Sequence, residues 1–167
     1  MKTLLVIRHA KSDHSNSHLS DFERPLNERG IEEAKILGKA LRKAQLFPEY
    51  ILSSPAKRAL DTAKLILKKK NHNILHLWED LYPGSIDSAF EAIRTIPEHV
   101  HMAALIGHNP ALETFVAKLI SRGDAMVRLT TATAAVVDLQ IDRWKEAESD
   151  NASLRLLFSG KIIRSWL

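Results

Sequence analysis

Thr3-Leu4-Leu5-Val6-Ile7-Arg8-His9 places an apolar run directly before two basic side chains. The run from Thr3 to Ile7 shows no alternation of polar and apolar residues, which is typical of a strand covered on both faces in a parallel sheet. Arg8 and His9 then stand where that strand ends. Because ligands bind beside the carboxyl ends of parallel strands, this stretch predicts both an α/β fold and the place of its functional site.

Short apolar runs and amphipathic segments alternate along the chain, which predicts βαβ units. We expect strands at 3–7, 50–52, 74–78, 102–106, 134–139 and 154–158, with the last two antiparallel at the sheet edge. Helices are expected at 27–44, after Ser54-Pro55, at 85–96, and from Asn109-Pro110 to about 120. In the two Pro-containing starts, Ser54 and Asn109 would be N-caps, each followed by proline as the first helical residue. The pattern therefore predicts a three-layer α/β/α fold with a mostly parallel central sheet.

The helix expected at 27–44 shows an apolar stripe. Its residues at helical spacing are Ile31, Ala34, Leu37, Leu41 and Ala44. Residues three and four apart share one face of a helix, so this stripe predicts the face that packs on the sheet.

The composition is that of an ordinary globular domain. The chain has 167 residues, of which 45% are hydrophobic and 26% charged, and no repeat or linker divides it, so we expect one domain over 1–167. No apolar run approaches the roughly 20 residues needed to cross a bilayer. Arg8 also ends the apolar start too early for a signal peptide. We therefore expect a cytoplasmic protein without a membrane partner.

Several kinds of chemistry are disfavoured. The chain has no cysteine, which excludes disulfides, a thiolate nucleophile and a cysteine-based metal site. His72 and His76 are closely spaced, as are His99 and His101, but no carboxylates complement them, so no metal site is predicted. The basic run 68–70 closes an expected helix, where cations suit the dipole, and no aromatic residues interleave it. A nucleic-acid partner is therefore not expected.

Basic side chains follow three of the expected strands. Arg8 and His9 end the first, Arg58 lies one turn into the helix after the second, and His108 follows the strand 102–106. The carboxyl ends of parallel strands meet at one edge, where helix N-termini also favour anions. An arginine fork can bind two phosphate oxygens, and a neutral imidazole can attack phosphorus. The sequence thus predicts a phosphate site with a histidine nucleophile and no need for a metal.

The stretches that carry these residues resemble motifs of the histidine phosphatase (phosphoglycerate mutase-like) superfamily. Val6-Ile7-Arg8-His9-Ala10 resembles its Arg-His-Gly signature, with alanine in place of glycine. Residues 53–63 (SSPAKRALDTA) resemble its Ser-Ser-Pro…Arg-Ala…Thr-Ala segment, and residues 107–110 (GHNP) its second-histidine motif. Residues 24–30 (RPLNERG) look like the entry to its first long helix. The matches span residues 4–110, and the short chain with its Arg-His-Ala variant is most similar to the SixA-like branch.

The resemblance implies a phosphoglycerate mutase-like fold and roles for particular residues. His9 would be the nucleophile that becomes phosphorylated, without metal or other cofactor. The transferring phosphoryl group would be bound by Arg8, Arg58 and His108.

Other roles follow from the resemblance with fewer matching residues. Ser12 and the backbone at Asn109 would add hydrogen bonds to the substrate. The family often places a glutamate after the third strand, which makes Glu79 the candidate general acid and Asp80 its alternative.

The expected substrate is a phosphorylated protein carrying phosphohistidine, because the short chain leaves little material for a lid over the site. A phosphatase of small phosphorylated metabolites is the alternative, and a mutase is disfavoured because it needs a closed site. Outside enzymes, a phospho-ligand binding module that has lost turnover remains open. A nucleotide-binding protein is disfavoured, since the chain has neither a G-x-G-x-x-G nor a P-loop run. His14 and His18, in the loop before the first helix, could contact substrate or remain solvated.

Overall fold

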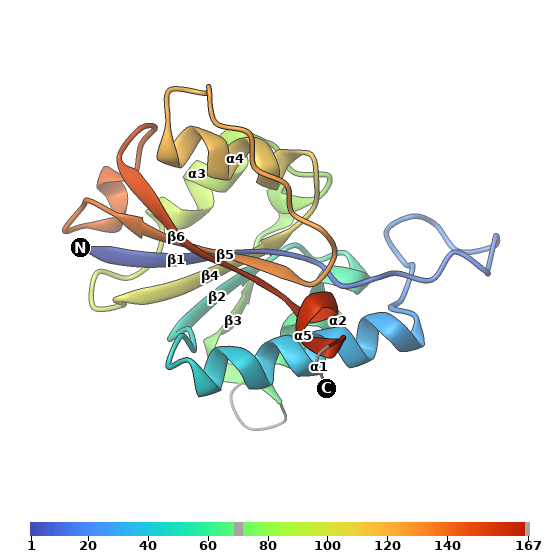
Figure 1. Cartoon of the computed structure of the whole chain (residues 1–167). Coiled ribbons are helices and arrows are strands. Elements are labelled where there is room, and N and C mark those ends of the chain that lie inside the picture. The colour runs from blue at the N-terminus through green and yellow to red at the C-terminus, as the bar shows by residue number, and fades with distance from the viewer. Residues whose placement is uncertain (69–71, 166–167) are drawn as a thin grey trace.

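A mixed sheet runs through the centre of the molecule (Figure 1). The computed structural model describes residues 1–68 and 72–165, and within them six strands form one sheet in the order β3-β2-β4-β1-β5-β6. The strands are β1 (Lys2–Arg8), β2 (Tyr50–Ser53), β3 (Leu75–Leu77), β4 (Met102–Gly107), β5 (Thr133–Leu139) and β6 (Ala152–Ser159). Neighbours from β3 to β1 pair in parallel, and β5 and β6 are antiparallel, as the sequence predicts.

Helices cover both faces of the sheet (Figure 1). Those on one face are α1 (Glu28–Lys43), α2 (Lys57–Leu67) and α5 (Gly160–Arg164), and those on the other are α3 (Ile86–Arg94) and α4 (Ala111–Ile120). Three short 3-10 turns, η1 (His72–Ile74), η2 (Glu79–Leu81) and η3 (Trp144–Glu146), interrupt the connections. The three-layer α/β/α architecture is therefore confirmed. The sequence did not predict α5, and β3 is shorter than the strand expected at 74–78.

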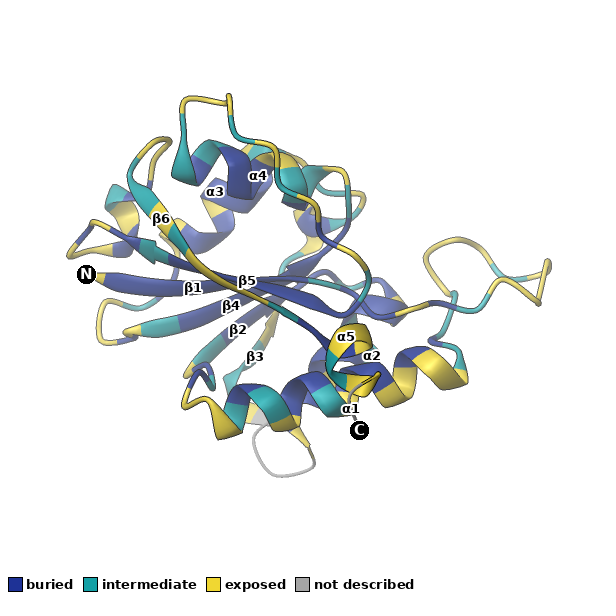
Figure 2. Cartoon of the chain, in the orientation of Figure 1, coloured by how far each residue is buried: buried dark blue, intermediate teal, exposed yellow. Residues whose placement is uncertain are grey.

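Alternate residues of β1 pack into different cores. Leu4 and Val6 belong to the apolar cluster that includes α3 and α4, whereas Leu5 and Ile7 belong to the cluster that includes α1 and α2. All four side chains are fully buried, and Figure 2 shows the central strands buried along most of their length. Burying such a side chain contributes roughly 1.5–3 kcal/mol. Both faces of the strand are covered, which explains why its sequence has no polar alternation.

The register of the parallel strands brings their carboxyl ends level. Arg8 of β1 pairs with Gly107 of β4, and Ser53 of β2 pairs with Ile106 of β4. Beyond the strands, the His9 amide donates to the Gly107 carbonyl oxygen (3.1 Å). Three chain segments far apart in sequence therefore leave the sheet side by side.

The predictions that Ser54 and Asn109 are helix N-caps are wrong. α2 begins at Lys57 and α4 at Ala111, so Ala56 and Pro110 occupy the N-cap positions, and neither cap forms a side-chain hydrogen bond. The Ser54 hydroxyl is instead hydrogen-bonded to the His108 ring (2.8 Å). The Asn109 amide donates to the carbonyl oxygen of Leu129 (3.0 Å). Both polar side chains thus belong to the strand-end region rather than to a helix start.

The inward face of α1 differs in part from the expected stripe. Ala34, Leu37 and Leu41 are buried, whereas Ile31 and Ala44 are exposed. Gly30, Glu33 and Gly38 are buried in addition. The glycines allow close approach: a Cβ on Gly38 would lie 2.8 Å from the Ile66 Cα of α2. Close backbone packing therefore turns the buried face toward these glycines.

Gly30 sets the position of the loop that follows His9. A Cβ at Gly30 would lie only 2.1 Å from the Lys11 carbonyl oxygen, a distance that no side chain can occupy. The same carbonyl accepts a hydrogen bond from the amide of Asn27 (3.0 Å), whose side chain caps α1 by accepting from the Gly30 amide (2.8 Å). The first turn of α1 is thereby held directly against the loop.

We expect Gly30→Ala to lower the free energy of unfolding by about 1–3 kcal/mol, because the added methyl group must push the loop from the helix. Denaturant unfolding followed by circular dichroism measures the change. Lys35→Ala, at an exposed position of the same helix, serves as the control and should change the free energy by less than about 0.5 kcal/mol. Equal stability of Gly30→Ala and the wild type would contradict the close contact.

Candidate functional site

Three of the predicted site residues come together at the level strand ends. His9 follows β1, His108 follows β4, and Arg58 lies in the first turn of α2. The two imidazole rings have centroids 5.1 Å apart, and Arg58 Nε donates to His9 Nε2 at 3.3 Å. All three residues are more than nine-tenths buried. Two imidazoles and a guanidinium group thus share one small, nearly dry space, which we call the histidine–arginine cluster.

The hydrogen bonds of His9 define which ring nitrogen can react. His9 Nδ1 lies 2.8 Å from the carbonyl oxygen of Ala10. A carbonyl oxygen can only accept, so Nδ1 carries the proton and Nε2 keeps its lone pair in the neutral ring. The Nε2 atom is also the one that faces Arg58. The arrangement therefore presents a nucleophilic nitrogen beside a positive charge.

Thr62 joins the two sides of the cluster. Its hydroxyl oxygen accepts from the Ala10 amide (3.0 Å), and the hydroxyl donates to the Arg58 carbonyl oxygen (2.7 Å). Ala10 occupies the position that is glycine in the related motif. It is fully buried, and its backbone amide links the chain after His9 to Thr62.

Burial keeps both imidazoles uncharged at neutral pH. The pKa of His9 is lowered to about 4, chiefly by loss of solvation and also by the charges of Arg58 and Arg8, against the opposing effect of the Ala10 carbonyl. Burial likewise lowers the pKa of His108 to about 3, with His9 and Arg58 contributing in the same direction. Neutral His9 is the form that can attack phosphorus.

Arg8 and Asn109 lie beside the cluster and share a partner. Arg8 Nη1 and the Asn109 amide both donate to the Leu129 carbonyl oxygen, at 2.8 and 3.0 Å. Arg8 Nε, His108 Nδ1 and Asn109 Oδ1 are buried and have no hydrogen-bond partner within residues 1–68 and 72–165. Buried polar atoms are normally paired, and leaving one unpaired costs about 1–3 kcal/mol. Their concentration here is typical of a binding site.

Two charged residues of the site were missed by the sequence analysis. Arg24 Nη2 lies 2.7 Å from Asp21 Oδ1, and Arg58 Nη2 lies 3.0 Å from Asp21 Oδ2. The Tyr82 hydroxyl also donates to Asp21 Oδ2 (2.9 Å). Asp21 therefore bridges two guanidinium groups and a tyrosine. Arg24 begins the motif at residues 24–30, but in the sequence only the neighbouring Pro25 marks its position, and a proline does not predict a role in the site.

Ser12 reaches the cluster indirectly. It is buried and forms an isolated bridge with Leu26. Its hydroxyl lies 3.5 Å from His14 Nε2, and the His14 ring contacts the Arg24 guanidinium group (Nη1 to Nε2, 2.7 Å). His18 is exposed. Ser12 and His14 thus lie in the same loop as Arg24. That either residue contacts the substrate stays a prediction.

Glu79 and Asp80 lie in the η2 turn, and both are exposed. Within the described residues, no hydrogen bond or ion pair joins either carboxylate to His9, Arg58 or His108. The residue of this segment that does reach the cluster is Tyr82, whose ring lies edge-on to His108 with centroids 5.6 Å apart. The role of Glu79 as general acid stays a prediction.

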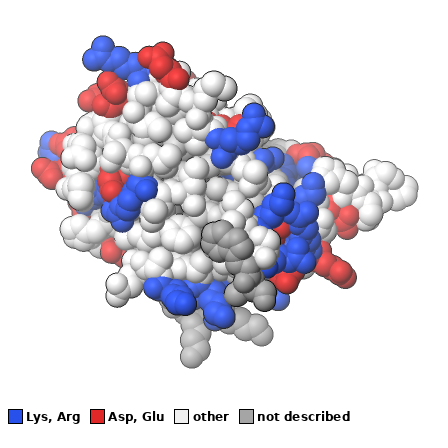
Figure 3. Space-filling view, viewed as in Figure 1, with Lys and Arg blue, Asp and Glu red and all other residues white. Residues whose placement is uncertain are grey.

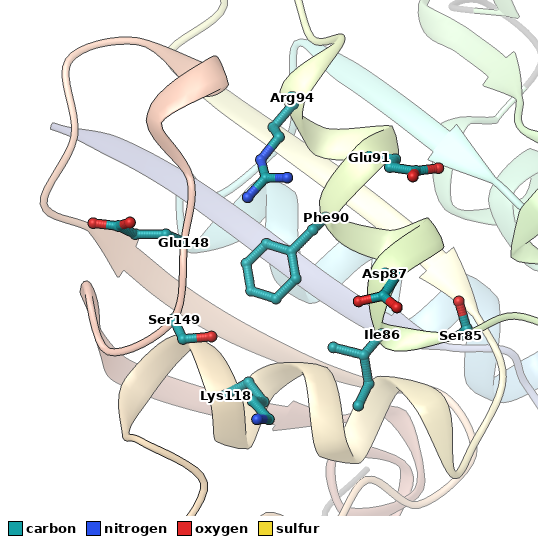
Figure 4. A pocket seen from close by; sticks show the side chains of 9 residues that line it. All are labelled: Ser85, Ile86, Asp87, Phe90, Glu91, Arg94, Lys118, Glu148 and Ser149. Atoms are coloured by element: carbon teal, nitrogen blue, oxygen red, sulfur yellow. The ribbon is translucent and has the colours of Figure 1, made fainter.

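A separate pocket of about 720 Å³ is bordered by α3 and α4 (Figure 4). It is lined by α3, Lys118 of α4 and the segment before β6, and Phe90 lies at its centre. Arg94 in its wall already donates twice to the Ala147 carbonyl oxygen, from Nε and Nη2. No histidine lines this pocket, so it does not contain the predicted nucleophile.

Three further expectations concern partners. Across the described residues, no group of three or more His, Cys, Asp or Glu side chains could hold a metal ion. None of the helices placed by the structure is long and apolar enough to traverse a bilayer. On the face seen in Figure 3, Lys and Arg form separate groups, several of them beside acidic side chains. Lys69 and Lys70 of the basic run lie outside the described residues.

The fold and the cluster together define an α/β protein with two imidazoles and a guanidinium group at the carboxyl ends of its parallel strands. The family model of the histidine phosphatase superfamily (branch 1) matches residues 4–83. SixA of Nakamurella multipartitia superposes with a TM-score of 0.81 at 22% identity, over 94% of this chain and 95% of that one. The protein histidine phosphatase SixA in complex with tungstate gives 0.80 at 23% identity, over 96% and 99%. The chain therefore resembles SixA in fold, and its first half resembles the histidine phosphatase superfamily in sequence.

Sequence relatives that align over most of this chain include uncharacterised proteins. An uncharacterised protein of Mycobacterium leprae is 29% identical over 157 residues, which cover 89% of this chain and 96% of that protein. An uncharacterised protein of Picosynechococcus is also 29% identical, over 95% of this chain and 96% of its own length. The likeness therefore extends over nearly the whole chain in each case.

The depressed histidine pKa values predict a stability that falls with acid. The pKa of His9 is about 4 in the folded state and 6.5 ordinarily, so between these values the unfolded chain binds more protons. The free energy of unfolding should therefore drop as the pH falls from 7 to 5. We expect His9→Gln to reduce this drop by about 1–2 kcal/mol in denaturant unfolding at the two pH values.

His18→Gln is the matched control, because His18 is exposed in the adjoining loop. Its unfolding should keep the full dependence on pH. If the free energy of unfolding of His9→Gln fell between pH 7 and pH 5 as much as that of the wild type, His9 would not be held neutral by the fold.

Proposed function

We propose that this protein is a metal-independent phosphatase that forms a phosphohistidine intermediate on His9. The match of residues 4–83 to the family model of the histidine phosphatase superfamily supports phosphatase activity. The observation that carries the proposal is the His9 ring itself. Its Nδ1–H is held by the Ala10 carbonyl, and its Nε2 lone pair faces the Arg58 guanidinium group.

In the first step, His9 Nε2 attacks phosphorus and forms a P–N bond while the bond from phosphorus to the leaving group breaks. Negative charge on the phosphoryl oxygens is stabilised by donors that are fixed before the substrate arrives. Arg58 supplies one guanidinium group, and Arg8 supplies a buried Nε–H without an internal partner. His108, held through Ser54, adds its unpaired Nδ1.

In the second step, water attacks the phosphohistidine, the P–N bond breaks, and inorganic phosphate leaves with the two protons of the water. The electron pair of the P–N bond returns to Nε2, and the ring proton stays on Nδ1, hydrogen-bonded to the Ala10 carbonyl oxygen, throughout. The same cationic groups stabilise both transition states, which is why we propose no metal or other cofactor. Arg24, bridged to Arg58 by Asp21, adds to the positive potential at the site.

The proposed substrate is a protein that carries phosphohistidine. Imidazole leaves phosphorus more readily than an alkoxide, so the reaction depends less on a general acid, and Glu79 is exposed. Solved proteins of similar fold include a protein histidine phosphatase. The alternative is a small phosphorylated metabolite, and an alpha-ribazole phosphatase of Shigella flexneri shares the fold at a TM-score of 0.69. We place the reaction in the cytoplasm and assign it to residues 1–167 as one domain.

We expect His9→Ala to lower the rate of phosphate release from an aryl phosphate at least about a thousandfold, because the attacking atom is removed. Rapid-quench labelling should find an acid-labile phosphoryl group on the wild type and none on the variant. Circular dichroism checks that the fold is kept. His101→Ala, an exposed histidine, is the control and should retain full activity.

Retained turnover in His9→Ala would overturn the nucleophile assignment. Loss of wild-type activity in EDTA, with recovery on adding zinc or magnesium, would overturn the metal-free mechanism. Absence of both a burst and steady release would instead identify a phospho-ligand binding module.

We also expect a ranking among substrates. Measured side by side, kcat/KM should be higher for a phosphohistidine-bearing protein than for sugar phosphates or aryl phosphates. A higher value for a sugar phosphate would favour the metabolite alternative while leaving the role of His9 intact.

A further inference from the structure

A chain of aromatic rings leads from His9 to the protein surface. The His108 centroid lies 5.1 Å from that of His9 and 5.6 Å from that of Tyr82. The Phe22 centroid lies 5.0 Å from that of Tyr82, with the rings nearly perpendicular (79°). Phe22 is 39% exposed, and Tyr82 is half-buried. One border of the histidine–arginine cluster is therefore aromatic.

This border is fixed in place by polar contacts rather than by a core. The Phe22 carbonyl oxygen accepts from the amide of Lys57 at the start of α2 (3.0 Å). Asp21, the preceding residue, holds the Tyr82 hydroxyl and the Arg58 guanidinium group. The Tyr82 side chain is thus held through its hydroxyl, and the Phe22 backbone is held against α2, which lowers the ordering cost of recognising a ligand there.

The rings lie beside the place where the leaving group must be. A phosphoryl group on His9 Nε2 would adjoin Arg58, whose Nε lies 3.3 Å from that atom, and His108, whose ring centroid lies 5.1 Å from that of His9. Tyr82 touches both of these residues: the Arg58 guanidinium carbon is 5.8 Å from its ring centroid, and His108 meets its ring edge. The substituent carried by the phosphoryl group is therefore within reach of Tyr82 and, farther out, of Phe22.

We propose that Phe22 and Tyr82 form the leaving-group subsite, and that this subsite selects a planar ring bonded directly to the phosphoryl group. The inference rests on the proposed phosphatase function and names the part of the substrate that the protein recognises. Ring pairs at 4.5–7 Å gain stabilisation from their quadrupoles in addition to buried area, and an alkyl chain gains only the area. The imidazole of phosphohistidine has the required shape, and so does a phenyl ring.

Binding of inert analogues tests the subsite without turnover. Phenylphosphonate and n-hexylphosphonate carry the same anion on a ring and on a flexible chain. By calorimetry we expect wild type to prefer phenylphosphonate, and Phe22→Ala to weaken its binding about three- to tenfold while changing n-hexylphosphonate less. Phe22→Tyr keeps a ring and should keep the preference, whereas Phe22→Leu keeps apolar area and should lose it.

Leu157→Ala is the matched control, since Leu157 is an exposed apolar residue of β6 (50%) remote from the cluster in sequence and element. It should bind both phosphonates as the wild type does. Equal weakening of the two phosphonates in Phe22→Ala, or no weakening of either, would overturn the ring subsite. So would a wild type without preference for the ring.

The outcome is separable from that of the proposed function. A ring preference that Phe22→Ala removes, in a protein that forms no phosphohistidine, would refute the phosphatase and leave the subsite standing. Normal labelling of His9 in a protein without any ring preference would support the phosphatase and refute the subsite. With peptides of one sequence, kcat/KM for phosphohistidine over phospholysine should fall about three- to tenfold in Phe22→Ala.

Discussion

The level ends of three parallel strands are the constraint on which the rest of the structure depends. Because Arg8 pairs with Gly107 and Ser53 with Ile106, the next residues of each segment emerge within a few ångströms of one another. Hydrophobic packing on both faces of the sheet fixes that register, since a one-residue slip would move buried side chains to the wrong core. The apolar interior and the polar site are therefore two results of the same alignment.

Burial at this edge has opposite effects on the two residue types gathered there. An arginine remains charged even when partly buried, so the cluster keeps its positive potential. A histidine responds to the same surroundings by losing its proton, as the lowered pKa values of His9 and His108 show. Asp21 is the carboxylate that pairs with two arginines of this region, Arg24 and Arg58. The result is an imidazole that stays neutral within a cationic environment.

The sequence predicted the parts of the site that are tied to regular elements. His9, His108 and Arg58 follow strands or begin a helix, and the rule that strand ends meet was enough to bring them together. Asp21, Phe22 and Arg24 lie in a long loop without periodicity, so no pattern could place their side chains. Ser54 and Asn109 were predicted to be helix caps because each precedes a proline at an expected helix start. In the fold, Ser54 hydrogen-bonds to His108 and Asn109 to the Leu129 carbonyl oxygen instead. In α1, the buried face was misjudged at Ile31, since the pattern of apolar residues does not register how closely a glycine lets backbones approach.

Thr62 has a mechanical consequence for the whole arrangement. Its single hydroxyl oxygen is bonded to the chain just after His9 and to the backbone of Arg58. Two segments separated by nearly fifty residues are thereby linked, so a shift of α2 would strain the hydrogen bond to the chain beside His9. The link opposes any change in the spacing between His9 Nε2 and the Arg58 guanidinium group.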